Sequence, residues 1–219
     1  MIFPNLKNKI FGYVNLNIES IAWCDINKIS NESKNILLDP TVCQKFIVDI
    51  HKKYSLDFSY GGWMEDRTNY LRQSYLEKGS KFIHLGIDIN VPTGTEVAND
   101  FKAEVVKIGD DFEPNLGWGP HVILKHLSKP VYLIYGHLDK KILCSKGDIL
   151  NENTIFATVG FPPDNGNWFP HVHVQVISEE YFSEIKNEIN NLDGYGYKNE
   201  IELNAKRHSD PMEFISLNF

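Results

Sequence analysis

The feature that most constrains this fold is a change of pattern near residue 81. From there to residue 177 the chain consists of short apolar runs separated by clusters of Gly, Pro, Asn and Asp. Apolar runs of this length, bounded by turn residues, are typical of strands. We therefore predict a mainly β fold, built as an antiparallel β-sheet or sandwich. The expected strands are Phe82–Ile89, Glu104–Ile108, His121–His126, Val131–Tyr135, Ile155–Val159 and His171–Ile177.

The segments on either side of this region have helical patterns. Apolar residues recur at helical spacing in Thr41–Tyr54, which predicts an amphipathic helix. Arg67–Lys78 is a second helical candidate and is followed by Gly79, a common helix stop. Residues 181–192 place Tyr, Ile, Ile and Leu on one helical face. The expected organisation is a partly helical N-terminal extension (1–80), a β core (81–178), and a C-terminal helix and tail packing on the core (179–219).

Composition excludes several classes of protein. The 219 residues include 22 Lys and Arg against 29 Asp and Glu, a net charge of −7. This balance argues against a nucleic-acid partner and against tight docking on an anionic membrane or cell wall. No apolar run approaches the ~18 residues that a membrane span needs. The first twenty residues lack a secretory signal pattern, so we expect a cytoplasmic protein, one whose leader has been removed, or one exported by a non-classical route.

Histidines are concentrated in three short motifs of the β region. In His171-Val172-His173, alternation along a strand places both imidazoles on one face, with Cα atoms roughly 6.6 Å apart. That spacing allows two ligands to one metal, or one ligand and one catalytic neighbour. Two histidines on a solvated strand face without function are the alternative.

His84 and Asp88 add a carboxylate, but a straight strand would separate their Cα atoms by about 13 Å. Both side chains reach one metal only if the backbone bends between them, and Gly86 at the midpoint permits a bend and leaves room for an ion. The alternative is a buried histidine and a turn aspartate. His137 follows Gly136 at the end of an expected strand, where functional side chains are often presented. By itself His137 fits a structural role equally well.

Taken together, the motifs resemble those of the lysostaphin/LytM-type zinc endopeptidases. That family has an H-x-x-x-D motif, a later G-H-L and an H-x-H. They stand here in the same order, as His84 to Asp88, Gly136-His137-Leu138 and His171-Val172-His173. The resemblance extends over residues 82–177.

The resemblance implies a Zn²⁺ ion held by His84, Asp88 and His173, with His137 and His171 as the catalytic pair. It also implies a groove with an antiparallel β-sheet floor. The substrate is then a peptide, most often a peptidoglycan cross-link or stem peptide. Three protein ligands with an open fourth position are what a catalytic zinc requires. The sequence leaves open which of the two histidines is the general base, and it does not determine the oligomeric state.

Three other functions use part of this residue set. Two histidines and one carboxylate also form the facial triad of non-haem iron oxygenases, but that function leaves His137 and His171 without a role. Glucose-permease IIA phosphocarriers carry an H-x-G-I-D string yet need no H-x-H. A non-catalytic regulator of the same fold would lose metal ligands, whereas all five positions are filled here.

Residues near these motifs suggest further roles. Arg67 fits either a substrate carboxylate or an ion pair with Glu65 or Asp66. Trp168 and Phe169, which lie just before the H-x-H motif, are expected either to form a groove wall or to pack beneath their loop.

Overall fold

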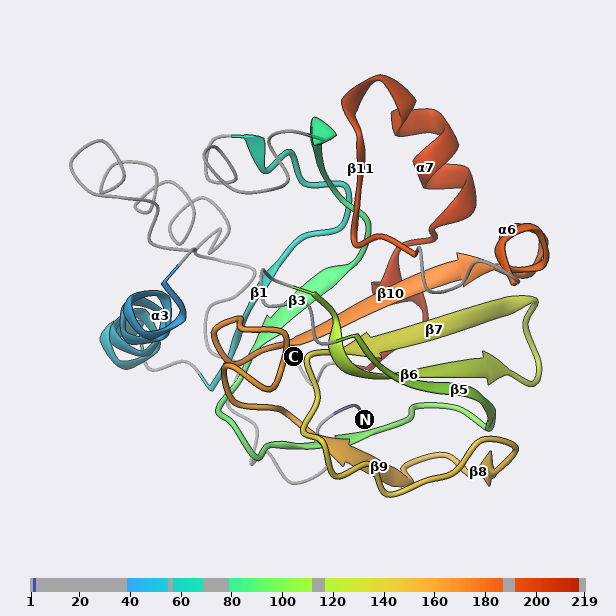
Figure 1. Cartoon of the computed structure of the whole chain (residues 1–219), viewed down its shortest axis with the longest axis horizontal. Coiled ribbons are helices and arrows are strands. Elements are labelled where there is room, and N and C mark those ends of the chain that lie inside the picture. The colour runs from blue at the N-terminus through green and yellow to red at the C-terminus, as the bar shows by residue number, and fades with distance from the viewer. Residues whose placement is uncertain are drawn as a thin grey trace.

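The protein is built around a seven-stranded antiparallel sheet, in which β10, β7, β6 and β5 lie side by side (Figure 1). The computed structural model describes Ile2 and residues 39–54, 57–68, 79–111, 117–186 and 192–216. The strand order is β1-β3-β10-β7-β6-β5-β8. The bounds are β1 Ser59–Gly61, β3 Ile87–Asn90, β5 Ala103–Asp111, β6 Gly119–His126, β7 Val131–Gly136, β8 Ile149–Leu150 and β10 Val172–Ser178.

Two small antiparallel sheets and several helices surround the large sheet. β2 (Lys81–His84) pairs with β11 (Tyr195–Tyr197), and β4 (Glu96–Ala98) pairs with β9 (Ile155–Thr158). The helices are α3 (Pro40–Tyr54), α6 (Glu179–Ile185) and α7 (Ile201–Arg207), with 3₁₀ turns η3 (Lys198–Glu200) and η4 (Pro211–Glu213). None of the helices in the described residues is long and apolar enough to cross a membrane.

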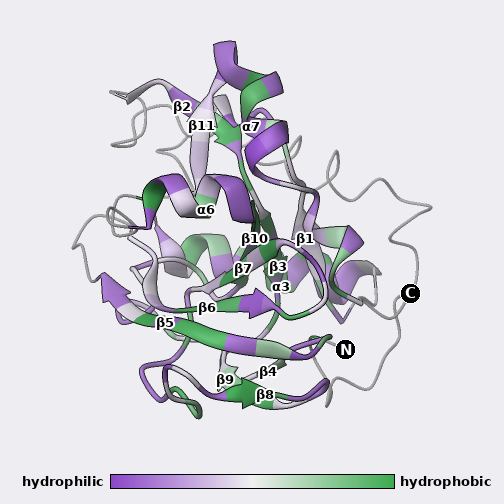
Figure 2. Cartoon of the chain, turned by 90° about the vertical axis from the view of Figure 1, so that its right-hand side faces the viewer, coloured by the Kyte–Doolittle hydropathy of each residue, from purple (hydrophilic) through white to green (hydrophobic). Residues whose placement is uncertain are grey.

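The two faces of the sheet are covered differently, as Figure 2 shows with α6 on one side of the strands and β4 and β9 on the other. One face joins the main core, which contains Val122, Leu124, Leu133, Tyr135, Val172, Val174 and Val176 together with Val97, Phe156 and Ala157. The opposite face packs Ile123, Tyr132, Ile134 and Ile177 against Tyr181 and Phe182 of α6. Because strand side chains alternate, His173 and Gln175 share this second face with Ile177.

Most of the expected elements are present, and the mainly β fold class is confirmed. The helix expected at Thr41–Tyr54 is α3. Ser178 caps the N-terminus of α6 by accepting a hydrogen bond from the Tyr181 amide. The helix expected over 181–192 begins earlier and ends at Ile185, and residues 187–191 lie outside the described residues. The apolar piece at 11–18 and most of the helix expected at 67–78 also lie outside them.

The single strand expected over Phe82–Ile89 is wrong. The chain forms two strands there, β2 and β3, which belong to different sheets. The break falls at Leu85–Gly86, where the alternation of side chains is interrupted. This break positions the first of the histidine motifs. The domain boundaries expected at residues 80 and 178 stay predictions.

Candidate metal centre

A row of residues across three neighbouring strands forms the base of the site. In register, His173 of β10 lies opposite Asp88 of β3 on one side and Gly136 of β7 on the other. A side chain at Gly136 would overlap the ring of Trp118, which packs edge-on to His173 with ring centroids 5.0 Å apart. The sheet therefore fixes the separation of Asp88 and His173 and leaves the third position free of a side chain.

His84 reaches this row from a different sheet. It ends β2, which pairs with β11, and the chain then turns at Gly86 into β3. A Cβ atom at Gly86 would lie within 2.6 Å of His173 Nε2 and still closer to the Val174 carbonyl oxygen. The structure thus has the bend that the sequence required between His84 and Asp88, and glycine allows β10 to approach it closely.

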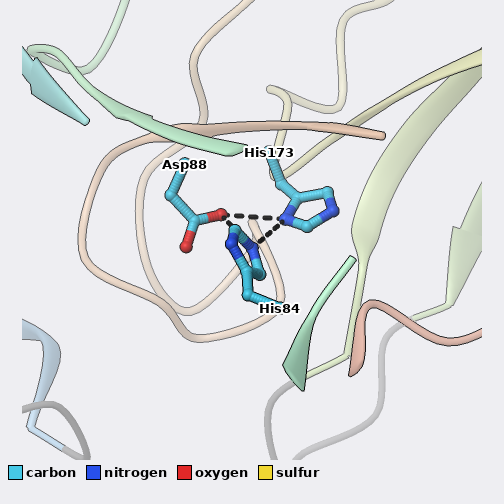
Figure 3. A group of neighbouring side chains, drawn as sticks. All are labelled: His84, Asp88 and His173. Carbon is cyan, nitrogen blue, oxygen red and sulfur yellow. Dashed lines mark hydrogen bonds and ion pairs between the residues drawn. The ribbon is translucent and has the colours of Figure 1, made fainter. Parts of the chain in front are cut away.

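Three donor atoms converge at the centre of the site (Figure 3). His84 Nε2 lies 3.1 Å from His173 Nδ1 and 3.3 Å from Asp88 Oδ1, and the last two atoms are 2.8 Å apart. All three side chains are buried, with exposed fractions of 0 to 5%. Three bonds of about 2.0–2.1 Å in a tetrahedral arrangement place their donor atoms roughly 3.3 Å apart. The observed triangle has the dimensions of one face of such a site.

The second nitrogen of each imidazole donates a hydrogen bond away from the site. The three converging atoms, His84 Nε2, His173 Nδ1 and Asp88 Oδ1, are therefore all acceptors. The His84 Nδ1–H group donates to the Gly62 carbonyl at 2.8 Å, so Nε2 carries the lone pair. The His173 Nε2–H group donates to Gln175 Oε1 at 3.1 Å, so Nδ1 carries the lone pair. Three lone-pair atoms at this distance repel one another unless a cation lies between them. Two imidazole nitrogens and one carboxylate oxygen, without a thiolate, fit zinc.

The protonation states agree with cation binding. Burial lowers the pKa of His84 to about 3, so this imidazole is neutral at neutral pH. Burial alone would raise the pKa of the Asp88 carboxyl, but its interactions with His84 and Arg67 hold that pKa well below its usual value. A neutral imidazole and an ionised carboxylate are the forms that bind a metal ion.

Two further imidazoles lie beside this triangle. His171 Nε2 is 3.5 Å from Asp88 Oδ1, and the rings of His171 and His137 have centroids 4.5 Å apart. Each ring is oriented by a backbone carbonyl, since His137 Nδ1–H donates to Asn165 at 3.0 Å and His171 Nδ1–H donates to Phe169 at 2.7 Å. Both Nε2 atoms are left without a proton. The structure therefore brings together all five site residues expected from the sequence.

The backbone of His137 is held in a conformation that few residues adopt. Its φ is 62°, in the left-handed region that is unfavourable for a residue with a side chain. Two hydrogen bonds maintain it, from the His137 amide to the Trp118 carbonyl and from the Gly160 amide to the His137 carbonyl. The surrounding loops thus fix the direction of this imidazole, although the backbone conformation that they impose on His137 is itself unfavourable.

Both imidazoles are in the unprotonated form at neutral pH. Burial lowers the pKa of His171, and burial with the neighbouring His171 and His173 holds the pKa of His137 well below its ordinary value. Each ring is neutral at neutral pH and has an unprotonated Nε2. Such groups act as general bases and, once protonated, as general acids.

The other residues singled out from the sequence have structural contacts. Arg67 is buried and pairs with Glu65, as expected, but its second carboxylate partner is Asp88. Trp168 and Phe169 are 8% and 3% exposed and pack against the histidine rings, so they lie beneath their loop. Of the two roles expected for these aromatics, packing beneath the loop has this support, and the groove wall stays a prediction.

Two residues of the site were missed by the sequence reasoning. Gln175 is fully buried and orients His173. Its position two residues beyond His173 on one strand was the available signal. Tyr195 contacts His84 with ring centroids 5.5 Å apart. No local pattern indicated it, because it comes from β11 in a distant part of the chain.

Comparisons with known proteins found one family model and several solved structures that are similar to this chain. Residues 82–185 match the model of peptidase family M23. A search of curated proteins found no match. Among solved structures, the chain is similar to a mutant catalytic domain of the prophage-encoded M23 protein EnpA of Enterococcus faecalis, at 24% identity over 55% of this chain and 81% of that one, with a TM-score of 0.42. It is also similar to the catalytic domain of the antimicrobial peptidase lysostaphin of Staphylococcus simulans (20% identity, 56% and 81% coverage, TM-score 0.44).

A third similar structure is a zinc-containing peptidase of Vibrio cholerae, at 21% identity with a TM-score of 0.43. The match covers 55% of this chain and 33% of that one. All five histidine and aspartate residues of the site lie inside the region of the family match, whereas Arg67 and Tyr195 lie outside it.

Proposed function

We propose that this chain is a zinc endopeptidase acting on peptidoglycan peptides. Its residues 82–185 match the model of peptidase family M23, and the chain is a metallopeptidase. The observation that carries the proposal is the convergence of three proton-free donor atoms beside two neutral imidazoles. The set provides a cation site and a proton-transfer pair within one buried cluster.

In this proposal His84, Asp88 and His173 hold the zinc ion. Three protein ligands leave a position open for water or substrate, which distinguishes a catalytic zinc from a structural one. When bound, zinc polarises a carbonyl oxygen and lowers the pKa of a coordinated water to about 7.

His137 and His171 move protons in the reaction. One of them accepts the proton of the attacking water at its free Nε2 atom and later delivers it to the leaving amine. The other can hydrogen-bond the oxyanion of the tetrahedral intermediate only once its own Nε2 atom has taken up a proton, because its Nδ1–H group is already donated to a backbone carbonyl. Their Nδ1–H groups are fixed on backbone carbonyls, so both rings keep their orientation while a proton is transferred at Nε2.

The substrate class rests on the motif resemblance. The order and spacing of the three histidine motifs are those of lysostaphin/LytM-type enzymes, and cross-links or stem peptides of peptidoglycan are the corresponding substrates. The net charge of −7 gives no general attraction to an anionic wall. Recognition would then depend on contacts at the site.

The experiment that tests this function uses the full chain and purified peptidoglycan. Protein purified without added metal is analysed for zinc, loaded with zinc where needed, and incubated with the polymer. We expect about one zinc per chain and peptide fragments that mass spectrometry identifies as products of one scissile bond. The His137→Ala variant serves as a control that keeps the ligands. Absence of zinc binding, or iron in its place, would overturn the proposal.

A further inference from the structure

Each of the three candidate ligands has a hydrogen bond to an atom that faces away from the centre of the triangle. Most of the groups that form these hydrogen bonds lie outside the region of the family match. His84 donates to the carbonyl of Gly62, and Asp88 Oδ2 accepts from Arg67, both from the segment before residue 82. His173 is held by Gln175, whose amide in turn donates to the Asp193 carbonyl beyond residue 185. The flanking segments therefore contact two residues of the triangle directly and reach the third through Gln175.

Arg67 has the most direct of these contacts. Its side chain is 2% exposed, and Nη1 lies 2.5 Å from Asp88 Oδ2, the oxygen that does not face the centre. Nε of the same guanidinium lies 2.9 Å from Glu65 Oε2. With one carboxylate oxygen bound to Arg67, Asp88 presents only Oδ1 to the two imidazoles. The guanidinium thus selects a single-oxygen contact to the cation site and fixes its direction.

Tyr195 fixes Arg67 from the other side of the sequence. Its hydroxyl lies 3.0 Å from Arg67 Nη1, and its ring contacts the imidazole of His84. Tyr195 is placed by the pairing of β11 with β2, where it lies opposite His84 in register. Residue 195 therefore contacts one ligand directly and a second ligand through Arg67.

A purely stabilising role explains this arrangement poorly. A buried ion pair adds little net stability over apolar residues of similar size, because desolvation of both charges offsets their attraction. The pair is also placed on the outer oxygen of a ligand and not elsewhere on the sheet. Groups that hydrogen-bond the outer atoms of metal ligands typically raise metal affinity by about 10–100-fold.

We propose that Arg67 is a positioning residue of the metal centre, held in place by Tyr195, so that segments before and after the family domain complete the site. The inference rests on the proposed function in that Asp88 is a metal ligand. It goes beyond that function by assigning the metal affinity partly to residues outside the peptidase domain.

The test compares zinc affinity in variants of the full chain, measured by competition with a chromophoric chelator. Arg67→Met removes the guanidinium at similar volume, and Tyr195→Phe removes only the hydroxyl. Lys198→Met is the matched control, because Lys198 bridges Asp66 at 2.7 Å and joins the same two segments at the surface without touching a ligand. Thermal unfolding of each metal-free variant reports structural damage separately.

We expect the dissociation constant for zinc to rise about 10–100-fold in Arg67→Met and about 2–10-fold in Tyr195→Phe, with no change in Lys198→Met. The visible absorption of Co²⁺ bound in place of zinc should shift in Arg67→Met and stay constant in Lys198→Met. If Arg67→Met does not fold without metal, Arg67→Lys and Tyr195→Phe decide the question, and both should weaken zinc binding.

Unchanged zinc affinity in folded Arg67→Met, or in both substitute variants, would overturn the inference and leave the proposed peptidase intact. An equal loss of zinc affinity in Lys198→Met would also overturn the inference. The loss in Arg67→Met would then result from weaker attachment of the two segments to each other and not from the contact with Asp88. If the unaltered chain binds no zinc, the proposed function itself fails, and the two failures are thereby distinguished.

Discussion

Replacing Gly86 with alanine tests whether the bend between the candidate ligands His84 and Asp88 is as closely packed as the structure indicates. The added Cβ would lie 2.6 Å from His173 Nε2 and even closer to the Val174 carbonyl oxygen. Ordinary contacts between such atoms are about 3.5 Å, so His173 has to move by roughly 0.9 Å and the Val174 carbonyl of β10 by more than that. Metal–ligand distances tolerate only about 0.2 Å. Zinc binding should therefore weaken strongly, by at least about tenfold.

The same clash should lower stability. Overpacking a buried site costs about 1–3 kcal/mol, and for a chain of this size each kcal/mol shifts Tm by about 2–4 °C. We expect the metal-free Gly86→Ala variant to melt roughly 2–12 °C lower in a calorimetric scan. Zinc affinity, measured by chelator competition at a temperature where the variant is folded, is the second readout.

Gly79→Ala is the matched control. The nearest atom to a Cβ at Gly79 is Lys81 Cγ at 4.0 Å, and its φ lies outside the left-handed region. This substitution should leave zinc affinity unchanged and raise stability slightly, by about 0.4–1 kcal/mol. A Gly86→Ala variant that behaved like Gly79→Ala in both measurements would refute the packing argument.

Three further outcomes are expected. His173→Ala should lose most of its zinc while His171→Ala retains it and loses hydrolysis, and equal zinc loss in both variants would make His171 a fourth ligand and the site a closed one. His137→Ala should keep its zinc and reduce turnover by about 10²–10⁴-fold in the peptidoglycan assay, whereas undiminished turnover would assign this histidine a structural role. Burial lowers the pKa of His51 to about 4, against about 6.5 in an unfolded chain, so between these values the unfolded state binds more protons and stability falls as the pH is lowered from about 6.5 to 4. Urea unfolding over this range should show a loss of at most about 3 kcal/mol from this group, and the same loss in His51→Gln would contradict the assignment.

The strands of the core could be predicted because their signals are local. Val131–Tyr135 and His171–Ile177 are apolar or alternating runs bounded by turn residues, and the corresponding strands β7 and β10 differ from them by one residue at each end at most. Short strands such as β11 lacked such a signal. Tyr195–Tyr197 forms a strand because β2 offers it a partner, so its structure depends on residues more than a hundred positions away.

The sequence by itself determined which side chains are candidates for the site and limited how they can be arranged. The spacing within His171-Val172-His173 and the glycine between His84 and Asp88 limit how those imidazoles and that carboxylate can be arranged, since strand geometry is the same in every protein. The spacing also required a bend at Gly86, and the structure has it.

Only the tertiary structure decided how these side chains are held. Arg67 and Tyr195 are 128 residues apart and meet through a hydrogen bond beside Asp88, and the left-handed backbone of His137 is maintained by Trp118 and Gly160. Such contacts depend on which strands pair and which loops pack together. Periodicity along the chain reports the direction of a side chain from its own strand, but not the neighbour that it will meet.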